Sequence, residues 1–269
     1  VMDHALSQLE LSEDIALDGF LSYTRSQYHP AEITHISGAE SQFIYAVVHT
    51  TLRRSGAMSP AQRLRRALIE TVWQPLRGVR EDCQALLGDL AATIERACRR
   101  RTVTLATDKH NAYPQALARV PLLAAALRSG RLVHRRVSSH AARTRSNPLF
   151  AVNYVERQLR KNLAEHVRET VRQGREINCQ MERMAIFVVL HNFLTPHRIS
   201  GKADARGEDR HASVAGLSPQ ALRWHLERFV THRHLWSHTR TGHEWIRRIW
   251  HHDYFNPPAV TLRDGRIDV

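Results

Sequence analysis

The feature that most constrains this 269-residue chain is a short strand pattern that ends on a carboxylate. The stretch "TVTLATD", residues 102–108, is apolar and partly β-branched, and it runs directly into Asp108. The residues that follow, "KHNAYP", are typical of a loop. An ionisable residue therefore stands where a chain usually has another apolar one, and the rest of the sequence must explain it.

Four further strands are predicted from the hydrophobic pattern. The run "LSEDIALDGF" predicts a first strand that ends at Asp18-Gly19. Residues 31–38 and 41–56 predict two more strands, joined by a turn at 38–40 into an antiparallel meander. The stretch "RLVHRRVSS", residues 131–139, predicts the last strand.

Helices are predicted between and after these strands. Ser59-Pro60 is a typical helix start, because proline fits the first turn. A second helical run extends from Glu81 to Arg99, and a third is helical before and after Pro121. A long helical tract from Asn147 to Leu194 is expected to break or bend near Gly174.

Composition shifts divide the chain into three parts. Residues 1–199 are expected to form an α/β domain, with a mixed sheet flanked by helices. Residues 200–211, "SGKADARGEDRH", are polar and turn-rich and predict a linker. Residues 212–269 are expected to form a mostly helical C-terminal extension. Its histidine-rich part, 225–252, suggests zinc by composition, although solvated histidines explain it equally simply.

The charge balance favours a polyanionic partner. Lys and Arg number 39 against 26 Asp and Glu, which gives a net charge of +13 with histidine neutral. Each phosphate that such a protein neutralises releases counterions, which favours binding to nucleic acid. A basic protein with no nucleic-acid role is the alternative.

Cysteine usage and hydropathy predict a cytoplasmic protein. Cys83, Cys98 and Cys179 are far apart in the sequence, which argues against a disulfide framework or a structural zinc site. The chain has no run of 18 apolar residues that predicts a membrane span, and its first residues lack the pattern of a signal peptide. Because it begins on Val1, it is expected to be the C-terminal part of a longer protein.

Three acids occupy related places in the predicted elements. Asp18 ends the first strand, Asp108 ends the fourth, and Glu156 lies early in the helix that follows the last strand. This order is the one that a ribonuclease H-like fold needs to bring two strand aspartates and a helical glutamate together. Hard cations such as Mg²⁺ prefer carboxylate oxygen, and two such ions activate phosphodiester chemistry.

These motifs resemble bacterial insertion-sequence transposases of the DDE class. The matching stretches are "LDGFLSYTRSQYHP", "ATDKHNAYP" and "NPLFAVNYVER", and weaker similarity extends over roughly residues 10–200. The resemblance implies that Asp18, Asp108 and Glu156 are catalytic and hold two Mg²⁺ or Mn²⁺ ions. It also implies cleavage and strand transfer of double-stranded DNA at element ends, by a homo-oligomer in the bacterial nucleoid.

Two departures from the family pattern leave other functions open. The DNA-binding module that usually precedes the catalytic domain in this family is expected to be absent, and the sequence after about residue 212 matches less clearly. A fragment, or a decayed transposase that only binds DNA, is therefore an alternative to an active enzyme. A related nuclease that hydrolyses DNA without strand transfer has the same predicted site.

Several side chains are candidates for contact with DNA or for the third acid. Glu169 is the main rival of Glu156, and His134 and His140 are candidates to assist at the scissile phosphate. Asn153 lies one helical turn before Glu156 and is expected to orient it or touch DNA. Arg157, Arg160, Lys161 and Arg168 recur along one predicted helix, and a solvated helix face is the other interpretation of these basic residues. The predicted DNA-binding residues are Asn153, Arg157, Arg160, Lys161, Arg168, Arg53 and Arg54.

Overall fold

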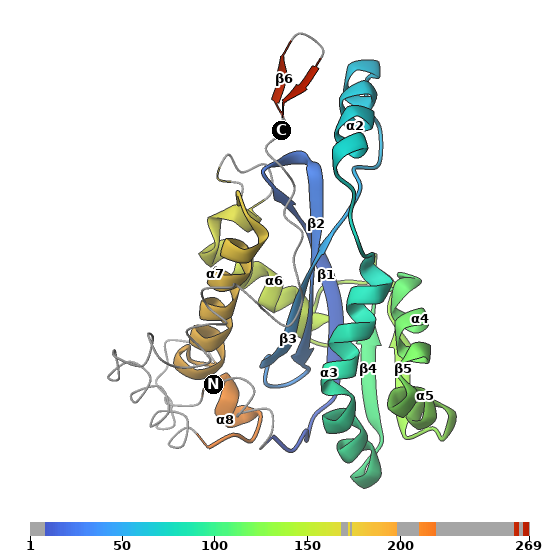
Figure 1. Ribbon diagram of the computed structural model, residues 1–269. Coiled ribbons are helices and arrows are strands. Elements are labelled where there is room, and N and C mark those ends of the chain that lie inside the picture. The colour runs from blue at the N-terminus through green and yellow to red at the C-terminus, as the bar shows by residue number, and fades with distance from the viewer. Residues whose placement is uncertain are drawn as a thin grey trace, which may run out of the picture.

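A five-stranded mixed sheet forms the centre of the protein (Figure 1). The computed structural model describes residues 9–167, 172, 174–197, 210–218, 261–263 and 266–268. The sheet has the strand order β3-β2-β1-β4-β5. The strands are β1 (Ile15–Thr24), β2 (Ser26–Gly38), β3 (Ile44–Thr51), β4 (Val103–Thr107) and β5 (Leu132–Arg136).

Strand direction divides the sheet into two halves. The first three strands form the predicted antiparallel meander, and β4 and β5 run parallel to β1. Parallel neighbours need a crossover connection, and the helix α3 (Val79–Arg100) lies within the connection from β3 to β4. The predicted α/β class is confirmed, and the architecture is consistent with a ribonuclease H-like fold.

Helices cover both faces of the sheet (Figure 1). On one face α3 packs with α4 (Ala112–Arg119) and α5 (Pro121–Arg128). On the other face lie α6 (Phe150–Asn162) and α7 (Ile177–Val189). The remaining described helices are α2 (Pro60–Val72), a 3₁₀ turn (Ala164–His166), a π-helical turn (Leu190–Leu194) and α8 (His211–Val214). None of the described helices is both long and apolar enough to span a lipid bilayer.

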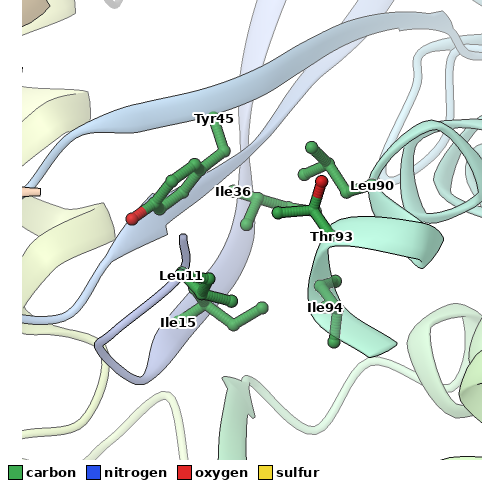
Figure 2. Close-up of a pocket in the computed structure, with 7 residues that line it drawn as sticks. All are labelled: Leu11, Ile15, Ile36, Tyr45, Leu90, Thr93 and Ile94. Carbon is green, nitrogen blue, oxygen red and sulfur yellow. The ribbon is translucent and has the colours of Figure 1, made fainter. Parts of the chain in front are cut away.

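Alternation along β1 assigns its side chains to two separate cores. Ile15 and Leu17 join the apolar core under α3, whereas Phe20 packs with residues of α6 and α7. Figure 2 shows side chains from the sheet opposite Leu90 and Ile94 of α3, around a void of about 10 Å³. This void has an apolar lining and belongs to the core, away from the three predicted acids.

The first strand continues past the predicted end. Asp18 was expected to close it, but β1 extends to Thr24 because β2 pairs with it up to Thr24 opposite Ser26, with an irregularity between Tyr23 and Thr24. Gly19 therefore lies inside a strand rather than in a turn. A Cβ atom at Gly19 would come within 2.6 Å of Glu32 Oε1, so glycine permits this close approach.

Three histidines fasten the C-terminal part of the described chain to the turn between β2 and β3. His197 Nε2, His211 Nδ1 and His191 Nε2 contact the carbonyl oxygens of residues 40, 41 and 42 at 2.9, 2.6 and 3.0 Å respectively. Burial lowers the pKa of His191 to about 4 and that of His211 to about 3, so both are neutral at pH 7.

The predicted domain boundaries stay a prediction, because residues 200–209 and 219–260 lie outside the described residues. That part includes the histidine-rich stretch 225–252. Ala212, Ala215 and Leu217 pack into the same core as the sheet. Within the extension predicted as helical, β6 (Thr261–Arg263) and β7 (Arg266–Asp268) instead form an antiparallel pair.

Replacement of Asn192 by alanine is expected to destabilise the fold strongly. The fully buried Asn192 side chain accepts from the Ile44 N–H and donates to the Ile44 carbonyl, both at 2.9 Å, at the edge strand β3. The substitution leaves two backbone groups unsatisfied, so the free energy of unfolding in urea should fall by about 2–4 kcal/mol. Asn162→Ala, at an exposed helix end, should change it by less than about 0.5 kcal/mol. Equal losses would contradict this assignment.

Candidate active site

The pairing of β1 with β4 brings Asp18 next to Asp108. The register aligns Ala16 with Ala106 and Leu17 with Thr107, so the next residues in each chain are the two aspartates. Parallel strands lie about 4.8 Å apart, and residues in register point to the same face. Asp108 follows the last residue of β4 directly, as predicted, whereas Asp18 lies within β1.

Helix α6 places Glu156 over the same part of β1. Val152 packs against Ala16 and Ala106, and Leu159, two turns further on, belongs to the cluster that contains Phe20. Glu156 lies between these two contacts on the sheet-facing side of the helix and is 8% exposed. Since Asp18 lies between Ala16 and Phe20 on the same face of β1, the glutamate is directed towards it.

Electrostatic coupling shows that the acids are near one another. The pKa of Asp18 is raised to about 7, first by burial and next by the charge of Glu156. The charges of Asp108 and Glu32 raise it further, while the hydrogen bond from the Gly19 N–H opposes the shift. Ionisation of Asp18 is therefore unfavourable, because its side chain is buried and lies near other carboxylates.

Backbone hydrogen bonds fix one oxygen of each aspartate. Asp18 Oδ1 accepts the N–H of Gly19 at 2.8 Å, and Asp108 Oδ1 accepts the N–H of His110 at 2.7 Å. Within the described chain, neither Oδ2 atom accepts a hydrogen bond from the protein. Each carboxylate is therefore oriented and retains an oxygen for a ligand.

The donor set suits hard divalent cations. Asp18, Asp108 and Glu156 offer only carboxylate oxygen, which Mg²⁺ and Mn²⁺ prefer, and a cation would relieve the like-charge repulsion that raises the pKa of Asp18. Within the described chain, no three His, Cys, Asp or Glu side chains form a single metal site. Two sites of two carboxylates each, with Asp18 in both, fit this arrangement better than one site of three, since Mg²⁺ usually keeps waters and takes one or two carboxylates.

His134 supports the backbone of Asp108 through a threonine. Thr107 Oγ1 donates to the Asp108 carbonyl at 2.7 Å, and His134 Nε2 lies 2.9 Å from the same hydroxyl. A hydroxyl has one proton, so the imidazole must donate through Nε2–H. His134 therefore fixes the end of β4, and its predicted assistance at a scissile phosphate stays a prediction. His140 is exposed in the loop after β5.

Glu32 of β2 is a fourth carboxylate near Gly19 that was not predicted from the sequence. Its side chain lies over Gly19, on the opposite face of the sheet from the side chain of Asp18. Burial raises the pKa of Glu32, whereas His110 and hydrogen bonds from Thr34 and Tyr113 lower it. The approach follows from the pairing of β1 with β2, which aligns Glu32 with Leu21, two residues after Gly19.

The predicted DNA-binding residues of α6 do not all behave as a free basic face. Asn153 Nδ2 donates to the Leu149 carbonyl of its own helix at 2.8 Å, so it does not orient Glu156 through that group. Arg160 is half-buried with its guanidinium 5.1 Å from the centre of the Phe20 ring. Arg157 and Lys161 are exposed.

Other predicted residues lie elsewhere or are not described. Arg53 and Arg54 follow β3. Arg53 contacts Glu70 of α2 and Gln74 just after it, and Arg54 contacts Tyr28 of the β1–β2 hairpin, away from the three acids. Arg168 and Glu169 lie outside the described residues. The DNA contact predicted for Arg168 and the alternative role of Glu169 as the third acid therefore stay predictions.

Comparison with known proteins gives only a distant structural similarity. No protein-family model and no curated protein matches the chain. Among solved structures, one chain of the simian T-cell lymphotropic virus intasome in complex with PP2A regulatory subunit B56 gamma aligns with a TM-score of 0.40 and 10% identity. The alignment covers 78% of this chain and 56% of that one. A similarity this distant is too weak to transfer an activity.

Asp18→Asn is expected to flatten the pH dependence of stability in the metal-free protein. Asp18 has a pKa of about 7 in the fold, against ~3.9 when unfolded. The folded state therefore binds the extra proton between these values, and its stability falls as pH rises through that window. Urea unfolding in EDTA should show wild type losing about 1–3 kcal/mol relative to the variant from pH 4 to pH 8.

The exposed acid Asp89 on α3 provides the control for this measurement. Asp89→Asn makes the same chemical change away from the site, and its free energy of unfolding should change with pH as that of wild type does. Parallel curves for wild type and Asp18→Asn would show that Asp18 ionises without the predicted cost.

Proposed function

We propose that this protein is a metal-dependent polynucleotidyl transferase, specifically a DDE-type transposase that cuts DNA strands and joins them at insertion-element ends. The alignment of Asp18 with Asp108 at the end of β4, under Glu156 of α6, is the observation that supports this most. The net charge of +13 supports a DNA substrate. The motif resemblance to insertion-sequence transposases supports the specific reaction.

The roles proposed for the residues follow from their placement. Asp18 and Asp108 would hold one ion and Asp18 and Glu156 the other, with Mg²⁺ or Mn²⁺ as the cofactor. Bound ions of this kind polarise the phosphodiester and make a water or a 3′-hydroxyl a better nucleophile. The backbone N–H groups of Gly19 and His110 keep the two aspartates oriented, and His134 stabilises the backbone at Asp108.

Asp108→Asn is expected to abolish nicking of supercoiled plasmid in Mg²⁺ or Mn²⁺. Substitution of residues that only hydrogen-bond to metal ligands already costs about 10–100-fold, so loss of a direct ligand should lower the cleavage rate at least about a hundredfold. The rate should be measured at enzyme concentrations that give equal DNA occupancy. Asp89→Asn, with the same charge change, should cleave like wild type.

The products of this assay separate the three candidate functions. Joined strands identify a transposase, whereas nicked product without joining identifies a nuclease with the same site. DNA binding without Asp108-dependent cleavage would contradict catalysis by this chain and favour the decayed transposase that only binds DNA.

A further inference from the structure

One segment of the chain beside the β1–β2 hairpin is strongly basic. Residues 53–77 contain six arginines and one glutamate, a net charge of +5 out of +13 for the whole protein. This segment comprises the residues between β3 and α2, helix α2 itself, and the residues that link α2 to α3. It lies beside the tip of the β1–β2 hairpin, at the far end of the molecule from α5 (Figure 1). We call this segment the α2 arm.

Aromatic contacts attach the α2 arm to the hairpin tip. Trp73 is 4% exposed, and its ring meets that of His29 edge-on at 4.8 Å. Tyr28 lies under two guanidinium groups, with Arg54 at 4.6 Å and Arg65 at 5.2 Å from its centre. These contacts hold the α2 arm against the hairpin tip, although Ile69 is the only buried residue of α2 itself.

The arginines of the arm are mostly free of acidic partners. Glu70 pairs with Arg66 at 2.7 Å and lies 3.9 Å from Arg53. Among the described residues, Arg63, Arg65 and Arg77 form no ion pair, and all three are exposed. Stacking on Tyr28 positions the guanidinium of Arg65 without using its N–H donors, which therefore remain available to a phosphate oxygen.

We propose that the α2 arm is a second DNA-binding surface, which contacts backbone phosphates of duplex DNA away from the acidic site. The charge of the arm and its unpaired arginines match a polyanion, and arginine binds phosphate in a forked geometry. Leu64 and Leu76 are also exposed, at 63% and 75%. A second copy of the chain on these leucines is the competing occupant, which the experiment distinguishes.

The position of the arm sets a spacing on DNA, and this part of the inference depends on the proposed function. Asp18 lies six residues before Thr24 along β1. At about 3.3 Å per residue the arm is therefore about 20 Å from the site. Base pairs rise about 3.4 Å, so the arm should contact phosphates about six base pairs to one side of the cut.

A charge-matched pair of triple variants tests the proposal. The arm variant is Arg63→Gln, Arg65→Gln and Arg77→Gln. The control is Arg119→Gln, Arg128→Gln and Arg131→Gln, which are exposed at the ends of α4 and α5 and just before β5. Both are made in the Asp108→Asn background and titrated with a 30-base-pair duplex in EDTA by fluorescence anisotropy at several salt concentrations. Circular dichroism and sedimentation check folding and oligomeric state.

The arm variant should bind at least about tenfold more weakly at 0.1 M salt, with a slope of log K against log salt that is shallower by about 2–3. The control should lose less than about threefold. Equal losses in both variants, or none in the arm variant, would overturn the proposal. A changed oligomeric state with unchanged DNA affinity would also overturn it and assign the arm to a second copy.

The outcome is independent of the proposed function, because binding is measured without cleavage. Weakened binding by the arm variant would support the arm even if no Asp108-dependent nicking is found. Nicking with an unchanged arm affinity would support the enzyme and overturn the arm. Hydroxyl-radical footprints on nicked DNA then test the spacing, since protection about six base pairs from the cut should disappear in the arm variant.

Discussion

The parallel pairing of β1 with β4 is the interaction on which the proposed site depends. Only three residue pairs connect the two strands, from Ile15 with Leu105 to Leu17 with Thr107. The pairing stops at the point where both chains reach an aspartate, so the sheet itself aligns the two carboxylates. A slip of one residue would turn one of them to the opposite face. The buried Ala16 and Ala106 oppose such a slip, because Val152 of α6 packs on both.

The same small residues explain how a helical acid reaches the sheet. Alanine at 16 and 106 allows α6 to approach closely, and Glu156 follows Val152 by about one helical turn. The cost of this arrangement appears in Asp18, whose pKa rises to about 7. Burying carboxylates together disfavours their ionised forms, so the geometry is stable at neutral pH only with protonation or a counter-cation. That cost is the physical argument for a metal.

Much of the architecture was predictable because the strands and helices have strong local patterns. The antiparallel meander and the helix start at Ser59-Pro60 depend on nearby residues, and the structure has both. The interruption expected near Gly174 in the long helical tract starts earlier, because α6 ends at Asn162, and α7 starts at Ile177. Asp108 was placed correctly at the end of its strand for the same reason. The end of β1 was placed wrongly, because Asp18-Gly19 has the local composition of a turn and only pairing with β2 overrides it.

The site was harder to predict where it depends on contacts between distant segments. Glu32 reaches Gly19 through strand register, and His134 reaches Thr107 through the pairing of β4 with β5. Neither contact has a signal in the local sequence. The α2 arm has one, in its arginines, but its attachment to the hairpin through Tyr28 and Trp73 appears only in the fold.

A crystal of the protein soaked in Mn²⁺, with anomalous diffraction to locate the metal, tests the proposed site at its centre. Peaks are expected at about 2.0–2.3 Å from carboxylate oxygens of Asp18, shared with Asp108 on one side and with Glu156 on the other. Soaked crystals of Asp18→Asn should lack both peaks. Density for Mn²⁺ elsewhere, or none near Asp18 at millimolar metal, would contradict the claim that these acids form a metal-dependent catalytic site.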